Sequence, residues 1–191
     1  MINPLHTASL FLVNTIFDLY LLILVVRIIL VYAGLNYFDP ITQFIVKCTD
    51  FLVKPLRRRL LPTIGGFELA SIVWVIIIAS VKFILISLLS IGIPNMVGIL
   101  ILAIADLFKL VLQTFFYAII LQAILSWFQP YSPLTRSLSQ ITAPVMRPFR
   151  RLIPLINGID ISPIPALIVL QLLSILLISP LMALGFAIAF G

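Results

Sequence analysis

Apolar residues fill four long stretches of this chain, at about residues 9–31, 69–91, 97–127 and 164–190. Each provides roughly the 20 mainly apolar residues that a helix needs to cross the hydrocarbon core of a bilayer. The second and third stretches are separated only by residues 92–95, a Gly-Ile-Pro-Asn turn sequence that ends helices. The pattern predicts an all-α membrane protein with about four transmembrane helices. The third stretch is long enough to tilt or to project from the bilayer.

Two less apolar segments, residues 39–61 and 132–154, connect the first stretch to the second and the third to the fourth. Each opens with a capping residue followed by proline, Asp39-Pro40 and Ser132-Pro133, as helices commonly do. Amphipathic helices that end in arginine clusters suit the inner-leaflet interface, with the apolar face buried and the cations near lipid phosphates. The apolar residues at helical spacing are Ile41, Phe44, Ile45, Cys48, Phe51 and Leu52 in the first segment, and Leu134, Leu138, Ile141, Val145 and Met146 in the second.

The composition excludes an ordinary soluble domain, because 63% of the 191 residues are hydrophobic and only 9% are charged. Most of the 12 Lys and Arg residues lie in the two connecting segments. Two spans separate these segments, so both face the same side, and the positive-inside rule makes that side the cytoplasm. We therefore expect a multi-pass protein of the bacterial inner (plasma) membrane with both termini outside. The cations concerned are Lys47, Lys54, Arg57, Arg58 and Arg59, then Arg136, Arg147, Arg150 and Arg151.

The chain contains an internal repeat. Residues 40–58 align with residues 133–151 without a gap, and their shared core is Lys54-Pro-Leu-Arg-Arg against Arg147-Pro-Phe-Arg-Arg. After a slip of one residue the alignment continues and pairs Glu68 with Asp160. Because an even number of spans separates equivalent points, the two copies insert with the same orientation, as parallel repeats. We predict a first repeat over residues 1–92 and a second over residues 93–191.

These motifs resemble the YggT family, also called YlmG, in its two-repeat form. The second copy carries the whole family pattern: Trp127-Phe128, Pro133, a Pro-x-Arg-Arg-x-x-Pro run over residues 148–154, and Gly-Ile-Asp-Ile-Ser-Pro over residues 158–163. The first copy departs from the pattern, with Val31-Tyr32 at the aromatic step and Glu68 as the acid. The resemblance implies a small integral membrane protein linked to osmotic or envelope-stress tolerance, to division and membrane organisation, or to cytochrome maturation in plastids. It implies no catalytic residue.

Four charged residues interrupt the apolar stretches: Asp18, Lys82, Asp106 and Lys109. A charge near the bilayer centre costs at least about 2.5 kcal/mol, so such residues need partners. Counting from the outer helix ends puts Asp18, Lys82 and Asp106 at similar depth. We predict a Lys82–Asp106 ion pair with Asp18 and Lys109 nearby, acting either as a structural link between helices or as part of an ion or proton path. Arg27 lies nearer the cytoplasmic end, where a snorkelling side chain reaches the interface.

Two features of the fourth stretch concern packing. Small residues recur four apart, Ala183 with Ala187 and Gly185 with Ala189, which favours close helix contact. Pro180 predicts a kink, because proline removes a backbone donor and clashes with the preceding turn.

Reactive chemistry is sparse. Cys48 is the single cysteine and His6 the single histidine, so we expect no metal, no redox cofactor and no hydrolase triad. The chain has no glycine-rich phosphate loop either, and we expect a protein that is not an enzyme. The sequence pI of about 9.9 points to anionic lipid headgroups rather than to nucleic acid, because the cations flank the membrane and no extramembrane domain carries a groove. Other membrane or cytoplasmic proteins are the next candidate partners, and a homo-oligomer is compatible with the pattern.

Three functions fit these observations. The first is a membrane organiser or adaptor that binds lipid or a partner through the basic segments. The second is a small ion transporter or channel component that uses the intramembrane charges. The third, an assembly factor for membrane proteins or cofactors, rests on the family resemblance. For the first function the lipid- or partner-binding residues are Lys54, Arg57, Arg58, Arg147, Arg150 and Arg151; for the second the polar network is Asp18, Lys82, Asp106 and Lys109.

Overall fold

A computed structural model describes residues 4–34, 40–59, 63–64, 67–90, 93–129, 131–153 and 160–190. Nearly all of these residues are helical. The elements in chain order are α1 (Pro4–Tyr32), α2 (Pro40–Arg59), β1 (Thr63–Ile64), β2 (Phe67–Glu68), α3 (Leu69–Ser90), α4 (Met96–Phe128), α5 (Pro133–Leu152), α6 (Pro163–Leu173), the π-helical turn η1 (Ser174–Ile178) and α7 (Ser179–Phe190).

Four helical segments are long and apolar enough to cross a membrane: α1, α3, α4 and the continuous run from α6 through η1 to α7. They coincide with the four predicted apolar stretches, so the predicted helical membrane class and number of spans are confirmed. The 33 residues of α4 correspond to about 50 Å of helix at 1.5 Å per residue, well beyond a hydrocarbon core of about 30 Å.

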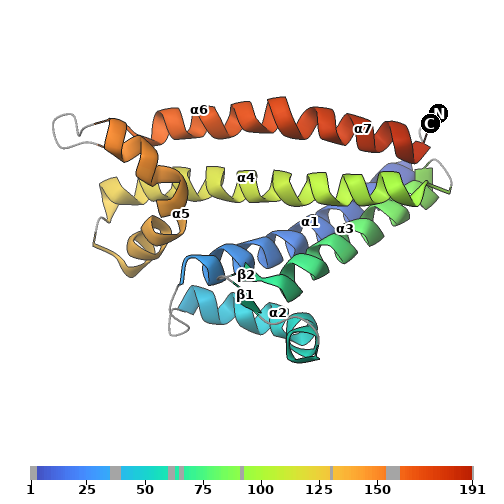
Figure 1. Cartoon of the computed structure of the whole chain (residues 1–191), viewed down its shortest axis with the longest axis horizontal. Helices are drawn as coiled ribbons and strands as arrows, with labels where there is room; N and C mark the ends of the chain where they lie inside the picture. The colour runs from blue at the N-terminus through green and yellow to red at the C-terminus, as the bar shows by residue number, and fades with distance from the viewer. Residues whose placement is uncertain are drawn as a thin grey trace.

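The spanning helices meet at one end and separate toward the other. Figure 1 shows α1 and α3 running as a pair that diverges from α4, while α6 and α7 follow α4 along its length. The short helices α2 and α5 lie at the divergent end, and both chain termini lie at the opposite end. The two segments that the sequence marks as basic therefore occupy the same end of the molecule.

Both connecting helices begin where the sequence predicts. The side chain of Ser132 caps α5 by accepting a hydrogen bond from the Thr135 backbone N–H at 3.1 Å, and Pro133 occupies the first turn. Helix α2 begins at Pro40, and Asp39, its predicted cap, lies outside the described residues. The sequence did not predict the short antiparallel ladder between β1 and β2, which precedes α3 and positions Glu68.

Close packing of α4 on α7 depends on glycine. A Cβ atom at Gly98 would lie 2.3 Å from the backbone nitrogen of Ala189, and one at Gly185 would lie 2.8 Å from the side chain of Leu102. The predicted small pair Gly185 and Ala189 is buried, whereas Ala183 and Ala187 are exposed. The structure thus uses one of the two small-residue pairs in this contact.

Replacing Gly98 with alanine should weaken the bundle, because the new methyl group meets backbone atoms that cannot rotate away. We expect a loss of about 1–3 kcal/mol, the usual range for an overpacked core, measured as the free energy of unfolding in mixed micelles. The matched control is Ala187→Val, which adds volume at an exposed position of α7. Equal stability of Gly98→Ala and wild type would contradict the close approach.

The fourth span passes Pro180 through a π-helical turn. Proline clashes with the carbonyl four residues earlier, here Leu176, which lies inside η1. In this turn the backbone N–H of Ser179 bonds the carbonyl of Ser174, five residues back. The wider turn accommodates the proline, so the predicted kink takes the form of a local π-helix.

Candidate functional site

Three spanning helices each contribute one charged residue to a cluster in the bundle. The Lys82 Nζ atom of α3 lies 2.9 Å from Asp106 Oδ2 of α4 and 2.5 Å from Asp18 Oδ1 of α1. Lys82 and Asp106 are buried, whereas the Asp18 side chain is 48% exposed. The predicted Lys82–Asp106 pair is therefore present, and Asp18 joins it as a second carboxylate on the same ammonium group.

Lys109, the fourth predicted member, lies one helical turn beyond Asp106 on α4 but forms no ion pair with any described residue. It lines a pocket of about 330 Å³ between α1 and α4, whose wall is mostly apolar but includes charged and polar side chains. The structure thus brings all four predicted charges to one region and pairs three of them directly. The pocket is lined by Thr15, Asp18, Leu19, Leu22, Asp106, Lys109, Leu110, Gln113 and Tyr117.

A second charged cluster lies near the divergent end and is centred on Arg27 of α1. Its guanidinium donates from Nε to Glu68 Oε2 at 2.6 Å and from Nη2 to Glu68 Oε1 at 3.0 Å. Its Nη1 donates to Thr49 Oγ1 at 2.7 Å and to Asp50 Oδ1 at 2.9 Å. Only 2% of Arg27 is exposed. The expectation that Arg27 snorkels to the interface is wrong, because α2 and β2 supply buried acceptors that satisfy the guanidinium inside the protein.

Glu68 accepts two further hydrogen bonds, from Ser71 Oγ at 2.6 Å and from Arg57 Nη1 at 3.2 Å. Burial by itself raises the pKa of this carboxyl, but the hydrogen bonds from Arg27 and Ser71 and the charges of Arg27 and Arg57 lower it by more. The pKa of Glu68 consequently lies below its ordinary value. The residue is held as a carboxylate that ties α1, α2 and α3 together.

The second repeat has a smaller version of the same arrangement. Arg150 Nε donates to Asp160 Oδ2 at 3.0 Å, and Asp160 Oδ1 accepts from the backbone N–H and the hydroxyl of Ser162. Burial raises the pKa of Asp160, yet the bonds from Ser162 and the charge of Arg150 hold it below its ordinary value. Arg150 and Asp160 align in the repeat with Arg57 and Glu68, so both copies bind the acid that precedes the next span with the same arginine.

The Arg27 cluster of the first repeat and its counterpart in the second repeat differ at one position, which is arginine on α1 and glutamine on α4. In the second repeat the Thr142 hydroxyl bonds the Gln122 side chain, and Thr142 aligns with Thr49. Gln122 of α4 therefore bonds Thr142 in the second repeat, as Arg27 of α1 bonds Thr49 in the first. Arg27 also joins Thr49 to Glu68, whereas Gln122 makes no bond to Asp160 within the described residues.

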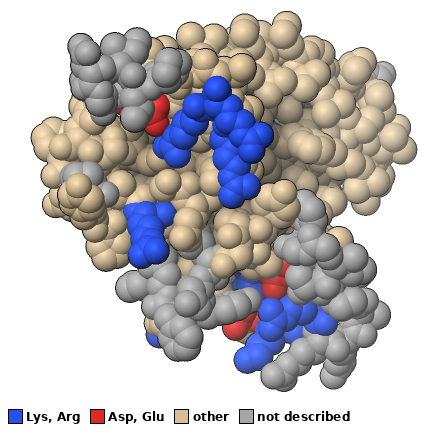
Figure 2. Space-filling model, turned by 60° about the vertical axis from the view of Figure 1, so that its left-hand side comes forward, with Lys and Arg blue, Asp and Glu red and all other residues tan. Residues whose placement is uncertain are grey.

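The six predicted lipid-binding cations fall into two groups. Arg57 and Arg150 are each paired with an acid. Lys54, Arg147 and Arg151 are exposed and have no ion-pair partner in the described part of the chain. The side chain of Arg58 lies outside the described residues. Figure 2 shows Lys and Arg side chains gathered on the face turned toward the divergent end, with a few acidic groups beside them.

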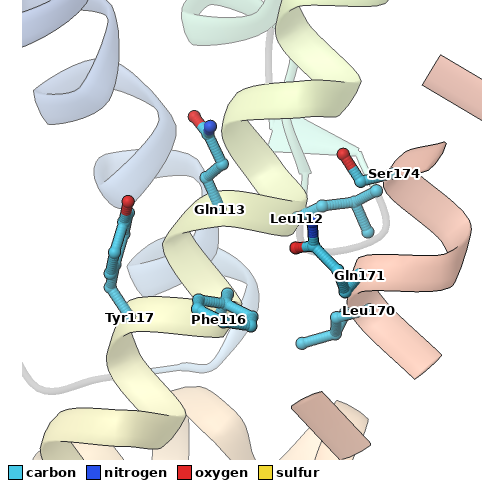
Figure 3. Close-up of a pocket in the computed structure, with 7 residues that line it drawn as sticks. All are labelled: Leu112, Gln113, Phe116, Tyr117, Leu170, Gln171 and Ser174. Atoms are coloured by element: carbon cyan, nitrogen blue, oxygen red, sulfur yellow. The ribbon is translucent and has the colours of Figure 1, made fainter. Parts of the chain in front are cut away.

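Another pocket, of about 130 Å³, lies between α4 and the α6–η1 junction. Its polar lining comes from Gln113 and Tyr117 of α4 and from Gln171 and Ser174 across from them (Figure 3). Among the described residues no group of three or more His, Cys, Asp or Glu side chains could hold a metal ion. The sites that the structure offers are therefore charged clusters and pockets between helices.

Comparison with known proteins links these features to a family. The family model described as CCB3/YggT matches residues 7–89 and 101–181, one segment in each predicted repeat. An uncharacterized protein of Pseudomonas aeruginosa is 40% identical over 94% of this chain and 92% of its own length. The YggT protein of Escherichia coli K12 is 33% identical over 92% of both chains. A protein of Vibrio alginolyticus is 34% identical over 87% of this chain and 91% of its own length. No solved structure matches.

Proposed function

This chain belongs to the CCB3/YggT family, and we propose that it is a non-enzymatic organiser or adaptor of the bacterial inner membrane. In this proposal its two basic segments bind anionic headgroups of the inner leaflet, and through this contact the protein supports osmotic or envelope-stress tolerance. The single observation that carries the proposal is the set of exposed cations Lys54, Arg147 and Arg151 on α2 and α5, which have no ion-pair partner among the residues that the structure describes.

The surface of α2 and the α4–α5 turn supports an interfacial position. On α2, Phe44 and Phe51 are 63% and 85% exposed, although the opposite face of the helix packs on the bundle through Ile45 and Val53. Trp127 at the end of α4 and Tyr131 in the turn that leads to α5 are also largely exposed. Exposed aromatic and apolar side chains beside cations suit the boundary between headgroups and acyl chains. The positive-inside rule then places this end in the cytoplasm and the termini outside.

The test is a double change, Arg147→Ala with Arg151→Ala, in cells that need the protein to grow under osmotic stress. Each cation near an anionic surface contributes about 1 kcal/mol, so the pair should weaken lipid association roughly 30-fold. We expect complementation to fail while the amount of protein in the membrane stays at the wild-type level. Cross-linking from position 151 to lipid should decrease in parallel.

Two control variants distinguish electrostatic binding to lipid from an effect of the substitutions on the folded structure. Replacing both residues with lysine keeps the charge and should restore growth and lipid cross-linking. Replacing Arg150 with alanine removes a cation that is already paired with Asp160, so it should affect lipid cross-linking less than the double change. Normal growth of the double alanine variant, or loss of growth only because the protein disappears, would refute the proposal.

The cluster around Lys82 favours a second candidate, a small ion transporter or channel component. Its support is the half-exposed Asp18 side chain, which lines the 330 Å³ pocket beside the buried pair. This candidate predicts ion flux through the purified protein in liposomes and its loss on Asp106→Asn. If no imposed gradient produced ion flux, the transporter or channel function would be ruled out.

A further inference from the structure

Two neighbouring pockets lie between α1 and α4, and together they are called the α1–α4 groove. The pocket that Lys109 lines shares Leu22 and Tyr117 with a neighbouring pocket of about 310 Å³. Its lining extends from the charged cluster to α5, and Figure 1 shows that α1 and α4 diverge toward that end of the molecule. The second pocket is almost wholly apolar and is lined by Leu22, Val26, Ile29, Thr114, Tyr117, Ala118, Leu121, Leu134, Ser137, Leu138 and Ile141.

The polar end of this groove offers hydrogen-bond donors. Lys109, Gln113 and Tyr117 line it, and the polar groups of their side chains make no hydrogen bond to any described residue. Figure 3 shows Gln113 and Tyr117 on the same side of α4. The carboxylates of Asp18 and Asp106, in contrast, already accept from Lys82. Because the Lys109 ammonium can only donate and has no acceptor among the described residues, this end of the groove suits a ligand whose polar atoms accept hydrogen bonds.

Charge and depth narrow the class of ligand. The two aspartates and two lysines at this end have formal charges that cancel, so an anionic head would leave a net charge inside the membrane. Lys82 lies eight residues before the end of α3 at Ser90, or about 12 Å along the helix. That depth is far from the layer in which charged headgroups are hydrated. A neutral head with acceptor oxygens, attached to a long apolar tail, satisfies both conditions.

We propose that the α1–α4 groove binds a long-chain quinone. Its neutral ring has carbonyl oxygens that accept hydrogen bonds from Lys109, Gln113 and Tyr117. Its tail occupies the apolar pocket beside α5, whose lining includes Ala118 and Leu138. This site is separate from the basic segments and does not depend on them.

The experiment uses the purified full-length protein in detergent and a photoreactive azidoquinone with a ten-carbon tail. After irradiation we expect labelled peptides from α1 and α4, near residues 15–22 and 109–121. Excess decylubiquinone should abolish the labelling, whereas excess decane or phosphatidylethanolamine should not. Equal competition by phosphatidylethanolamine would overturn the proposal in favour of a phospholipid site, and labelling outside the groove would overturn it altogether.

Two variants test the head and the tail separately. Gln113→Leu keeps the size of the side chain but removes the donor, and should lower the affinity for decylubiquinone about tenfold. Ala118→Trp fills the tail pocket and should abolish competed labelling. Gln140→Leu, the same change at an exposed position of α5, should bind as wild type. Wild-type labelling and competition in both groove variants would overturn the proposal, whether or not the basic segments bind lipid.

Discussion

Replacing Lys82 with methionine should destabilise the protein by about 3–5 kcal/mol, the usual effect of removing one partner of a buried ion pair. The reason is that one ammonium group serves two carboxylates, Asp18 on α1 and Asp106 on α4. Methionine has a similar length but no charge, so both acids lose their partner and Asp106 keeps a buried side chain without one. We expect a lower free energy of unfolding in mixed micelles and less protein in the membrane.

The Asp106→Asn variant should lose less free energy of unfolding than Lys82→Met, because Lys82 keeps its contact with Asp18. A double variant, Lys82→Gln with Asp106→Asn, should recover part of the stability that Lys82→Gln alone loses. The reason is that it leaves no unpaired charge between α3 and α4. The coupling energy from this cycle reports the pair directly. Strictly additive losses would contradict a stabilising interaction between Lys82 and Asp106.

The Arg27→Met change should have an effect of comparable size, about 3 kcal/mol. Arg27 makes four hydrogen bonds from its guanidinium, two of them to Glu68, which is itself 1% exposed. Without Arg27 this carboxylate keeps only Ser71 and the half-exposed Arg57. Because the cluster joins α1 to α2 and to the start of α3, we expect α2 to become sensitive to proteolysis at lower denaturant concentrations than in the wild type.

The second repeat supplies the matched control. Arg150 and Asp160 have side chains 38% and 31% exposed, and ion pairs at such positions contribute about 0–1 kcal/mol. Arg150→Met should therefore leave the free energy of unfolding nearly unchanged. If Arg27→Met and Arg150→Met lowered the free energy of unfolding by the same amount, the burial of Arg27 would not strengthen its interactions.

The predictions that depend on neighbouring residues in the chain agree with the structure. The four spans follow from runs of apolar residues, and α5 starts at Ser132-Pro133 because capping is decided within one turn. The Lys82–Asp106 pair was also predictable, since hydropathy fixes the depth of each charge and a charge at that depth needs a partner.

Other features required the positions of residues far apart in the chain. Depth alone assigns Arg27 to the interface, and only the packing of β2 against α1 brings Glu68, 41 residues away, onto its guanidinium. The same holds for Gly98, which is an ordinary helix residue until Ala189 of α7 approaches it. In the basic segments the sequence gives equal weight to all six cations, whereas the structure pairs Arg57 and Arg150 with acids.

The sequence by itself determined that this protein is a helical membrane protein with four spans, two basic connecting helices and a charged layer within the bundle. Those properties follow from hydropathy, helix capping and charge, which act over one span or one turn. The tertiary structure decided which charges are satisfied and where a ligand has room, because both depend on the angle at which α1 leaves α4 and on the side chains that then meet or stay apart.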